Sequence, residues 1–298
     1  SRGLGDVYKR QDKGENSSKM IPFFSIIGGW WKYLFYIVMI NFLGYRYSAK
    51  HEKKYFCLAI LLFLFSTYLI LGTSRWAIIF HFVVTFYLFR IIFDRTLVKK
   101  LLVFVPLFVC LFFLITIYKF QNDLGSDYSL INFADLFVSQ LQDYFSGPSL
   151  IGHAIDMGHK YNITFETCWN DFVGAIPLLS KTVDQMNRTN ILFNQYVISP
   201  DTEWFTQIIP ATGLGYIYFG SMFAPIFTVV FNILGLHFDY KLLNTSNLFV
   251  KYVLIYCSLW GGLSICFNTQ IPFGNVVVYI FPLYLFYRLF SKLTIKLA

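Results

Sequence analysis

Long apolar runs separated by short polar connections dominate the sequence from residue 21 onward. A helix that crosses a bilayer needs about 20 mostly apolar residues. Seven runs approach this length, at 21–45, 55–71, 76–93, 101–118, 208–238, 252–267 and 276–289. The pattern predicts an all-α integral membrane protein with about seven transmembrane helices.

Two of these runs are irregular. Gly28, Gly29 and Lys32 interrupt the first run, and the aromatic pair Trp30-Trp31 suits a membrane interface, so its span is expected to begin near Tyr33. The fifth run is too long for one straight span, so its start is expected to be interfacial or re-entrant.

Basic residues between the runs predict the orientation. They gather at four places: Arg46, Lys50, Lys53 and Lys54; Arg90, Arg95, Lys99 and Lys100; Lys241 and Lys251; and Arg288, Lys292 and Lys296. Seven spans put all four places on one side of the membrane. By the positive-inside rule this side is the cytoplasm.

The opposite side receives one long loop, residues 119–207. The loop holds ten of the sixteen acidic residues of the chain. A loop of this length is usually functional and usually contains some helix, and we expect short helices across the membrane face at 136–145 and 167–178. The chain thus divides into a tail (1–20), four spans (21–118), the external loop (119–207) and three spans (208–298).

The amino-acid composition agrees with a chain that is surrounded mainly by the lipid bilayer. Only 13% of the residues are charged, while 56% are hydrophobic, and a soluble domain could not cover its surface with so few charges. The net charge of +8 follows from the cytoplasmic basic sites, so no nucleic-acid partner is expected. The five cysteines form no CxxC pair, and no metal or cofactor is expected.

The first residues are polar and aperiodic. The stretch 1–11 resembles a translated sequencing adaptor and is left out of the functional reasoning. We expect the chain to be the C-terminal part of a longer membrane protein.

Arg75 is the sharpest single signal. It follows Gly72-Thr73-Ser74 at the external end of a helical hairpin, where the positive-inside rule disfavours arginine. A guanidinium matches phosphate oxygens with a fixed fork of donors. The alternative is a snorkelling arginine beside an interfacial tryptophan, and position alone leaves both open.

Other candidate chemistry lies in the loop and at its exit. Asp201 and Glu203 are carboxylates at a membrane face, fit either for a general base or for an ordinary helix start. His153 can exchange protons near neutral pH, although a lone loop histidine is more often structural. The segment Ala211–Gly220 contains three glycines and two tyrosines, which favours close helix packing first and contact with glycan or lipid second. His81 is expected to make a helix–helix hydrogen bond.

Three features together resemble the bacterial O-antigen or oligosaccharide repeat-unit polymerases (Wzy-type) of the O-antigen ligase/polymerase superfamily. They are the Gly72-Thr-Ser-Arg75 turn, the single long external loop, and the segment 206–225 (TQIIPATGLGYIYFGSMFAP) that follows the loop. The resemblance covers roughly residues 21–298.

The resemblance implies a metal-independent, inverting glycosyltransferase with a GT-C-like fold in the bacterial cytoplasmic (inner) membrane. Its substrate would be a polyprenyl-diphosphate-linked oligosaccharide. On this reading Arg75, with Arg188, holds the diphosphate, and Glu203, Asp201 or His153 is the base. Substrate contacts are assigned to these residues: Ser74, Arg188, Gly213, Gly215, Tyr216 and Tyr218. A flippase and a chain-length regulator are the protein partners implied.

Three other functions stay open. An O-antigen ligase would share the architecture. A polysaccharide transporter or flippase would place ionisable residues at mid-span and show internal repeats; Lys32 and His81 are the plausible mid-span residues, and no repeat appears. A structural membrane subunit would carry no chemistry.

Overall fold

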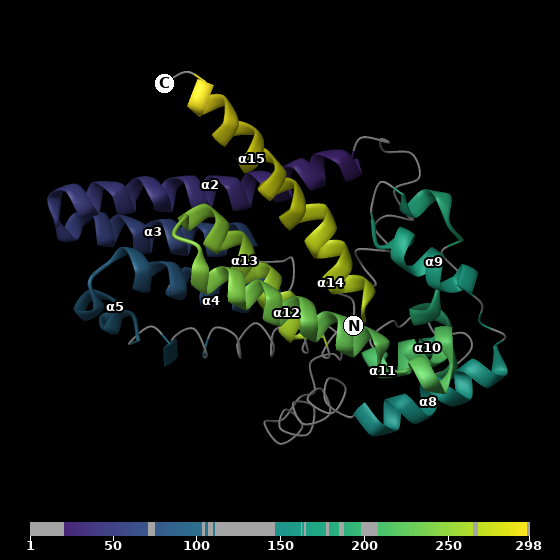
Figure 1. Ribbon diagram of the computed structural model, residues 1–298. Coiled ribbons are helices and arrows are strands. Elements are labelled where there is room, and N and C mark those ends of the chain that lie inside the picture. Colours follow the sequence, from purple (N-terminus) through teal and green to yellow (C-terminus); the bar gives the residue numbers. More distant parts are fainter. Residues whose placement is uncertain are drawn as a thin grey trace, which may run out of the picture. The chain divides into compact units, whose positions relative to one another are not determined.

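The computed structural model describes residues 21–70, 75–102, 105–106, 110, 147–161, 163, 165–176, 179–184, 188–197, 208–264 and 268–296. Every regular element in these ranges is helical (Figure 1). The chain divides into two compact units. We call residues 1–23, 117–236 and 260–278 the loop unit, and residues 24–116, 237–259 and 279–298 the bundle unit.

The N-terminal half of the bundle unit contains three long helices and a short one. They are α2 (Ile21–Lys50), α3 (Lys53–Ile70), α4 (Arg75–Ile92) and α5 (Arg95–Leu101). Aromatic pairs hold the long helices together: Phe35 meets Phe65 at 6.5 Å and Phe56 meets Phe89 at 6.0 Å between ring centroids. The predicted runs 55–71 and 76–93 correspond closely to α3 and α4.

Helix α2 differs from its prediction. It is continuous through Gly28 and Gly29, and its membrane-length apolar part begins at Ile26 rather than near Tyr33. A Cβ atom at Gly29 would lie 2.5 Å from the ring of Tyr279. The glycine therefore admits a tightly packed aromatic ring, and this packing outweighs its low helix propensity.

The C-terminal half of the chain contributes α12 (Ile226–Asn244), α13 (Leu248–Gly262), α14 (Gln270–Asn275), a π-helical turn (Val276–Ile280) and α15 (Phe281–Lys296). Within the bundle unit, Tyr256 contacts Tyr33 and Tyr252 contacts Tyr36, with centroids 5.4 and 6.3 Å apart. Because the residue order is reversed, α13 runs antiparallel to α2.

Within the described ranges, four helices are long and apolar enough to cross a membrane: Ile26–Lys50, Lys53–Ile70, Ser221–Asn244 and Gln270–Leu289. Trp76–Ile92 and Leu248–Gly262 are shorter apolar helices. The protein is therefore a helical membrane protein. The predicted fourth span, 101–118, lies mostly outside the described residues.

The long fifth run is divided, as its length predicted. Helix α11 (Ala211–Phe219) ends at Gly220, and the candidate span begins at Ser221. Gly220 has a φ of 77°, a left-handed conformation that glycine adopts at little cost. This residue separates a short entry helix from the span.

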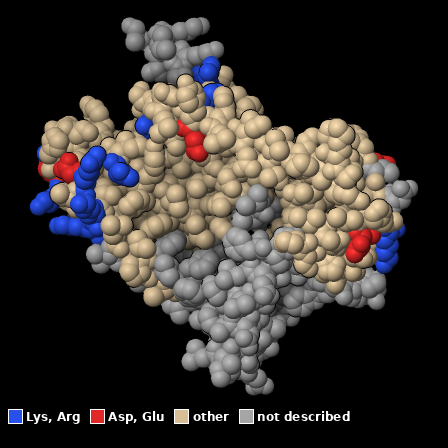
Figure 2. Space-filling view, turned by 60° about the horizontal axis from the view of Figure 1, so that its bottom comes forward, with Lys and Arg blue, Asp and Glu red and all other residues tan. Residues whose placement is uncertain are grey.

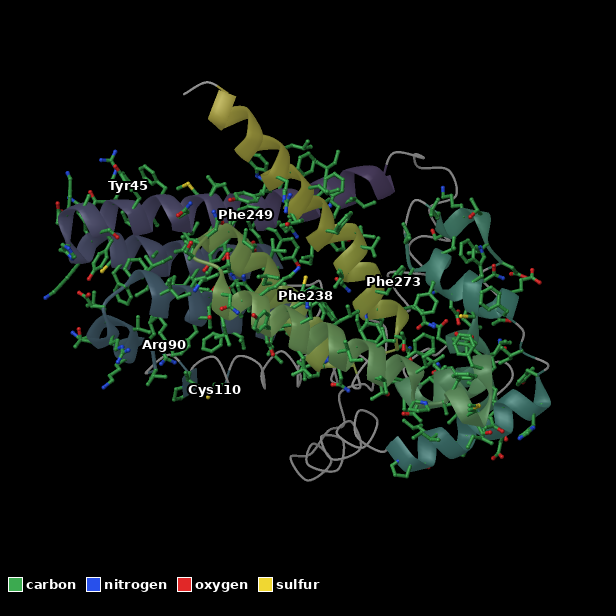
Figure 3. All side chains as sticks on the ribbon, viewed as in Figure 1. Tyr45, Arg90, Cys110, Phe238, Phe249 and Phe273 are labelled. Carbon is green, nitrogen blue, oxygen red and sulfur yellow. The ribbon has the colours of Figure 1, made fainter. Side chains whose placement is uncertain are left out.

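Contacts inside the bundle unit bring the basic sites to one end. Tyr47 of α2 donates a hydrogen bond to Asp94, 2.5 Å away, and the ring of Phe93 meets those of Tyr47 and Phe56. Figure 2 shows Lys and Arg side chains gathered at this end, and Arg90 is labelled there in Figure 3. The antiparallel direction of α13 puts Lys251 toward the same end.

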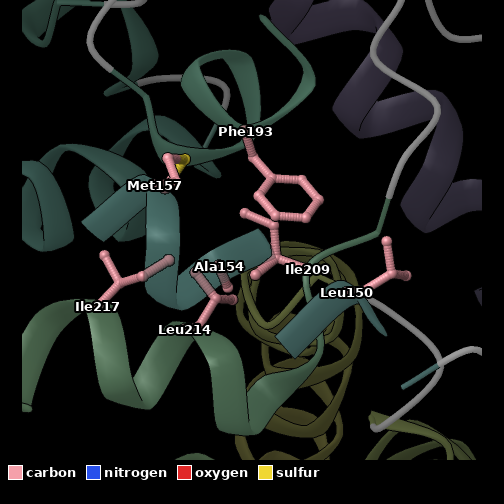
Figure 4. Close-up of a cluster of buried hydrophobic side chains, with 7 residues drawn as sticks. All are labelled: Leu150, Ala154, Met157, Phe193, Ile209, Leu214 and Ile217. Carbon is pink, nitrogen blue, oxygen red and sulfur yellow. The ribbon is translucent and has the colours of Figure 1, made fainter. Parts of the chain in front are cut away.

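The loop unit has a hydrophobic core of its own (Figure 4). Its helices are α8 (Gly147–Lys160), α9 (Phe165–Gly174), α10 (Thr189–Val197) and α11, with a 3-10 turn at Ser180–Thr182. The core consists of Leu150, Ala154, Met157, Phe193, Ile209, Leu214 and Ile217. Helix α9 overlaps the helix expected at 167–178 but begins two residues earlier, at Phe165, and ends at Gly174. Helices α8 and α10 were not predicted, and 136–145 lies outside the described residues.

Candidate functional site

Asp171 is the centre of a buried polar cluster in the loop unit. It lies in α9 and is fully buried. Its Oδ1 accepts a hydrogen bond from the backbone N–H of Thr189 at 3.1 Å, and its Oδ2 accepts one from the hydroxyl of Tyr218. We call Asp171, Arg188, Thr189 and Tyr218 the Asp171 cluster.

Arg188 supplies the positive charge of this cluster. Its Nε lies 3.8 Å from Asp171 Oδ1, and the residue is only 7% exposed. Gly174, one turn after Asp171 on α9, leaves room for the guanidinium, because a Cβ there would lie 3.4 Å from Nε. The carboxylate therefore compensates part of the charge of a buried guanidinium.

Tyr218 joins α11 to the cluster. Its hydroxyl lies 2.9 Å from the hydroxyl of Thr189, in addition to its bond with Asp171. Three elements that are distant in sequence thus meet at one carboxylate: α9, the start of α10 and α11. A buried carboxylate that lost these hydrogen bonds would destabilise the fold. The bonds therefore hold the three elements in a fixed register relative to one another.

Burial raises the pKa of Asp171, and the hydrogen bonds from Thr189 and Tyr218 and the charge of Arg188 offset only part of this shift. Burial, with the charge of Asp171, also raises the pKa of Tyr218 well above its ordinary value. Since Asp171 has no exposed surface, it can orient its neighbours but cannot directly take a proton from a substrate in this conformation.

The cluster lies close to the start of two candidate spans. Phe172 contacts Phe227 at 5.7 Å and Phe273 at 5.1 Å between ring centroids, and Phe273 is labelled in Figure 3. Phe227 is near the beginning of the span Ser221–Asn244, and Phe273 is near the beginning of Gln270–Leu289. Helix α9 is therefore held beside the entry of these helices into the apolar region.

The structure brings together two of the predicted substrate-binding residues, Arg188 and Tyr218, and adds Asp171. Sequence reasoning missed Asp171, which was counted only as one acidic loop residue. Its partners lie 18 and 47 positions further along the chain, so no local motif marks it.

Gly213 and Gly215 stand at close contacts of α11. A Cβ at Gly213 would lie 2.9 Å from the Cβ of Ala154, and one at Gly215 would lie 2.1 Å from the carbonyl oxygen of Ala224. The packing role expected first for this segment is thus confirmed. The assignment of both glycines to substrate contact stays a prediction.

Tyr216 and His153 lie on other parts of the loop unit. The Tyr216 hydroxyl is 3.2 Å from Nε2 of His159, at the C-terminal end of α8. His153 is exposed on α8, and its ring meets that of Tyr196 at 6.4 Å between centroids. Neither residue takes part in the hydrogen bonds described for the Asp171 cluster. Their predicted roles, as substrate contact and base, are not tested by these contacts.

Four predicted residues involve segments whose side chains are not described. Ser74, Asp201 and Glu203 lie outside the described residues, and for Arg75 only the backbone, at the first residue of α4, is described. The chain after the Asp201–Glu203 segment is anchored, because the N–H of Ile209 donates to Oδ1 of Asn268 at 2.7 Å.

A second buried polar cluster lies in the bundle unit. Ser66 Oγ is 2.6 Å from His81 Nε2, and the Tyr36 hydroxyl is 2.6 Å from Thr85 Oγ1. The rings of Tyr36 and His81 meet at 4.6 Å. We call these four residues the His81 cluster. The helix–helix hydrogen bond expected for His81 is confirmed, with α3 as the partner.

Among the described residues, no group of three or more His, Cys, Asp or Glu side chains could hold a metal ion. Comparison with protein-family models, curated proteins and solved structures finds no match for this chain. The fold and the two clusters thus define a class of protein: a helical membrane protein with a folded helical loop unit.

Proposed function

We propose that this chain is a membrane-embedded glycosyltransferase that polymerises polyprenyl-diphosphate-linked oligosaccharide repeat units in the bacterial cytoplasmic membrane. The observation that carries the proposal is the position of Arg75. It begins α4, an 18-residue helix whose length is about 27 Å, and Arg90 near the other end belongs to the basic end of the bundle unit. Arg75 is therefore separated from the basic sites by most of a membrane thickness.

An arginine at this end has a chemical use in the proposed reaction. The acceptor hydroxyl oxygen bonds to the anomeric carbon of the donor sugar, and the bond from that carbon to the diphosphate oxygen breaks. The electron pair leaves with the diphosphate, and the hydroxyl proton goes to a base. A guanidinium stabilises the charge that develops on the diphosphate. We assign this role to Arg75, and the role of base to Glu203, Asp201 or His153.

The loop unit supports an extracytoplasmic role for its own residues. It has a separate hydrophobic core and a charged cluster oriented by buried hydrogen bonds, as a rigid binding domain requires. We propose that it binds the glycan, and that Asp171 keeps Arg188 and Tyr218 in position. Seven spans, a GT-C-like arrangement and partnership with a flippase and a chain-length regulator belong to the same proposal.

The test replaces Arg75 in cells that depend on this chain for polymer. Arg75→Ala is expected to abolish elongation and leave single repeat units attached to the carrier. Arg75→Lys should retain less activity than wild type, because a lysine keeps the charge but loses the bidentate fork. Arg90→Ala, at the basic end, is the matched control and should elongate normally. Normal polymer from Arg75→Ala would overturn the assignment.

A second function, transport of a lipid-linked saccharide, is favoured by two observations. His81 is an ionisable residue buried in an apolar helix, and such residues often mark transport pathways. The break at Gly220 also resembles the discontinuous helices of transporters. Uptake of a labelled lipid-linked repeat unit into vesicles, without formation of a new glycosidic bond, would support this function instead.

A further inference from the structure

Helix α8 presents two different sides. Leu150, Ala154 and Met157 recur at helical spacing and belong to the hydrophobic core. His153, Asp156 and Lys160 have the spacing i, i+3, i+7, so they form one stripe along the helix. All three are exposed. The stripe therefore carries an imidazole, a carboxylate and an ammonium group within two turns.

Two tyrosines border this stripe. Tyr161 and Tyr196 are partly buried and pack against the hydrophobic core of the loop unit. Their ring centroids are 6.5 Å apart, and Lys160 Nζ lies 5.4 Å from the first and 5.2 Å from the second. His153 meets Tyr196 at 6.4 Å. The rings are thus anchored on one side by the core and held together by a cation on the other.

The chemistry of this surface matches a saccharide. A sugar ring offers an apolar C–H face and hydroxyls that both donate and accept hydrogen bonds. Aromatic rings pack against the C–H face, while a carboxylate accepts, an ammonium donates and an imidazole does either. Asp156, one helical turn from both His153 and Lys160, makes the surface unsuited to phosphate or another polyanion, because like charges repel.

We propose that His153, Asp156, Lys160, Tyr161 and Tyr196, here called the α8 surface, bind the saccharide chain that the enzyme extends. The proposal rests on the proposed function and names the place in the loop unit that holds the glycan. It gives His153 a binding role in place of the role of base. Anchored tyrosines cost little conformational entropy on binding, so their rings are already in position to pack against a sugar.

The test uses the purified whole chain in lipid nanodiscs and soluble probes. The probes are chitotetraose, maltohexaose and the glycan released by mild acid from cells that carry the chain. Saturation-transfer NMR measures affinity. Asp156→Ala and Lys160→Ala should each weaken binding of the released glycan about tenfold, as loss of a hydrogen bond to a charged group does. Lys181→Ala, an exposed lysine on the 3-10 turn, is the control and should bind as wild type does.

Tyr196 is tested by two substitutions that keep the core filled. Tyr196→Phe preserves the ring and should bind nearly as wild type, whereas Tyr196→Leu should bind weakly. Circular dichroism and hydrogen exchange of α8 check that each variant is folded. If none of the probes binds wild type, or if all of these variants bind equally well, the proposal is overturned.

Polymer length separates this proposal from the proposed function. In cells, Asp156→Ala and Lys160→Ala should give shorter polymer while Arg75→Ala gives none. If the chain elongates glycan and these variants give polymer of normal length and bind glycan with normal affinity, glycan binding by the α8 surface is refuted and the proposed function stands. If the variants lose glycan affinity but wild type forms no glycosidic bond, the surface stands and the function is refuted.

Discussion

The two buried polar clusters both pair polar side chains away from solvent, but they use different chemical groups. In the loop unit, the Asp171 cluster contains a carboxylate and a guanidinium with an N–O distance of 3.8 Å, together with two hydroxyls. In the bundle unit, the His81 cluster contains three hydroxyls and one imidazole, without a carboxylate or guanidinium among its members.

The two clusters differ in what their groups cost inside hydrocarbon. A charged side chain is costly there, even where it has a partner, whereas hydroxyl and imidazole groups can be satisfied by a neighbouring helix. The His81 cluster, which joins α3 to α4, uses only the groups that cost less.

The largest expected effect comes from breaking the ion pair. Asp171→Ala removes the buried acceptor of the Thr189 and Tyr218 hydrogen bonds as well as a negative charge beside Arg188, and should lower the free energy of unfolding of the loop unit by about 3–5 kcal/mol. Hydrogen exchange of the amides in α9, α10 and α11 measures this loss of unfolding free energy. Glu166→Ala, an exposed carboxylate in the first turn of the same helix, should change this free energy by less than about 0.5 kcal/mol. Equal effects would mean that the charge pair does not stabilise the unit.

The two units also differ in what lies against their closely packed glycines. A Cβ at Gly215 would meet the carbonyl of Ala224, whereas one at Gly44 of α2 would meet a methyl group of Ile92 at 2.7 Å. A side chain can rotate away and a backbone carbonyl cannot. Gly215→Ala should therefore destabilise its unit by about 1–3 kcal/mol, and Gly44→Ala should destabilise by less. Thermal unfolding in detergent compares them, and a larger loss from Gly44→Ala would contradict this packing.

A smaller effect is expected in the His81 cluster. Ser66→Ala removes the hydroxyl that pairs with His81 and should cost about 1 kcal/mol, the usual size for an interhelical hydrogen bond in a membrane. Ser48→Ala is the matched control, because its hydroxyl bonds only to the carbonyl of Gly44 within its own helix among the described contacts. A loss as large as that of Asp171→Ala would show that the neutral cluster matters as much as the charged one.

The smallest expected effect is a pH dependence. Because the pKa of Asp171 is raised in the folded protein, its ionisation disfavours folding. This contribution to stability is fully present below the ordinary aspartate pKa of about 3.9 and is lost as the pH rises through the raised value. Asp171→Asn cannot ionise, so the difference in unfolding free energy between wild type and variant should fall with rising pH. Parallel curves would contradict the shift.

Much of the bundle could be predicted from sequence because apolar runs report directly on membrane helices. The runs at 55–71 and 76–93 match α3 and α4, and the excessive length of 208–238 correctly indicated a division. The start of α2 was predicted too late, because Trp30-Trp31 suggested a membrane interface and the glycines suggested a weak helix. In the structure Trp30 contacts Phe286, and Gly29 packs against Tyr279.

The loop unit was less predictable because its helices are short and amphipathic. In α8 the apolar positions Leu150, Ala154 and Met157 are interrupted by glycines and histidines, which dilute the periodic signal. Arg188 and Tyr218 were each singled out, yet nothing in the sequence connected them. Asp171 connects them in three dimensions, and that contact depends on tertiary packing.

The central claim, glycosyl transfer from a polyprenyl diphosphate, is tested most directly with the purified chain in liposomes and a synthetic polyprenyl-diphosphate-linked repeat unit. The measurement counts free polyprenyl diphosphate released and glycosidic bonds formed, and determines the anomeric configuration of the new bond by NMR. The account predicts one carrier released for each bond formed, with inverted configuration, and neither product from Arg75→Ala. Movement of the lipid-linked unit across the bilayer with no carrier released would contradict it.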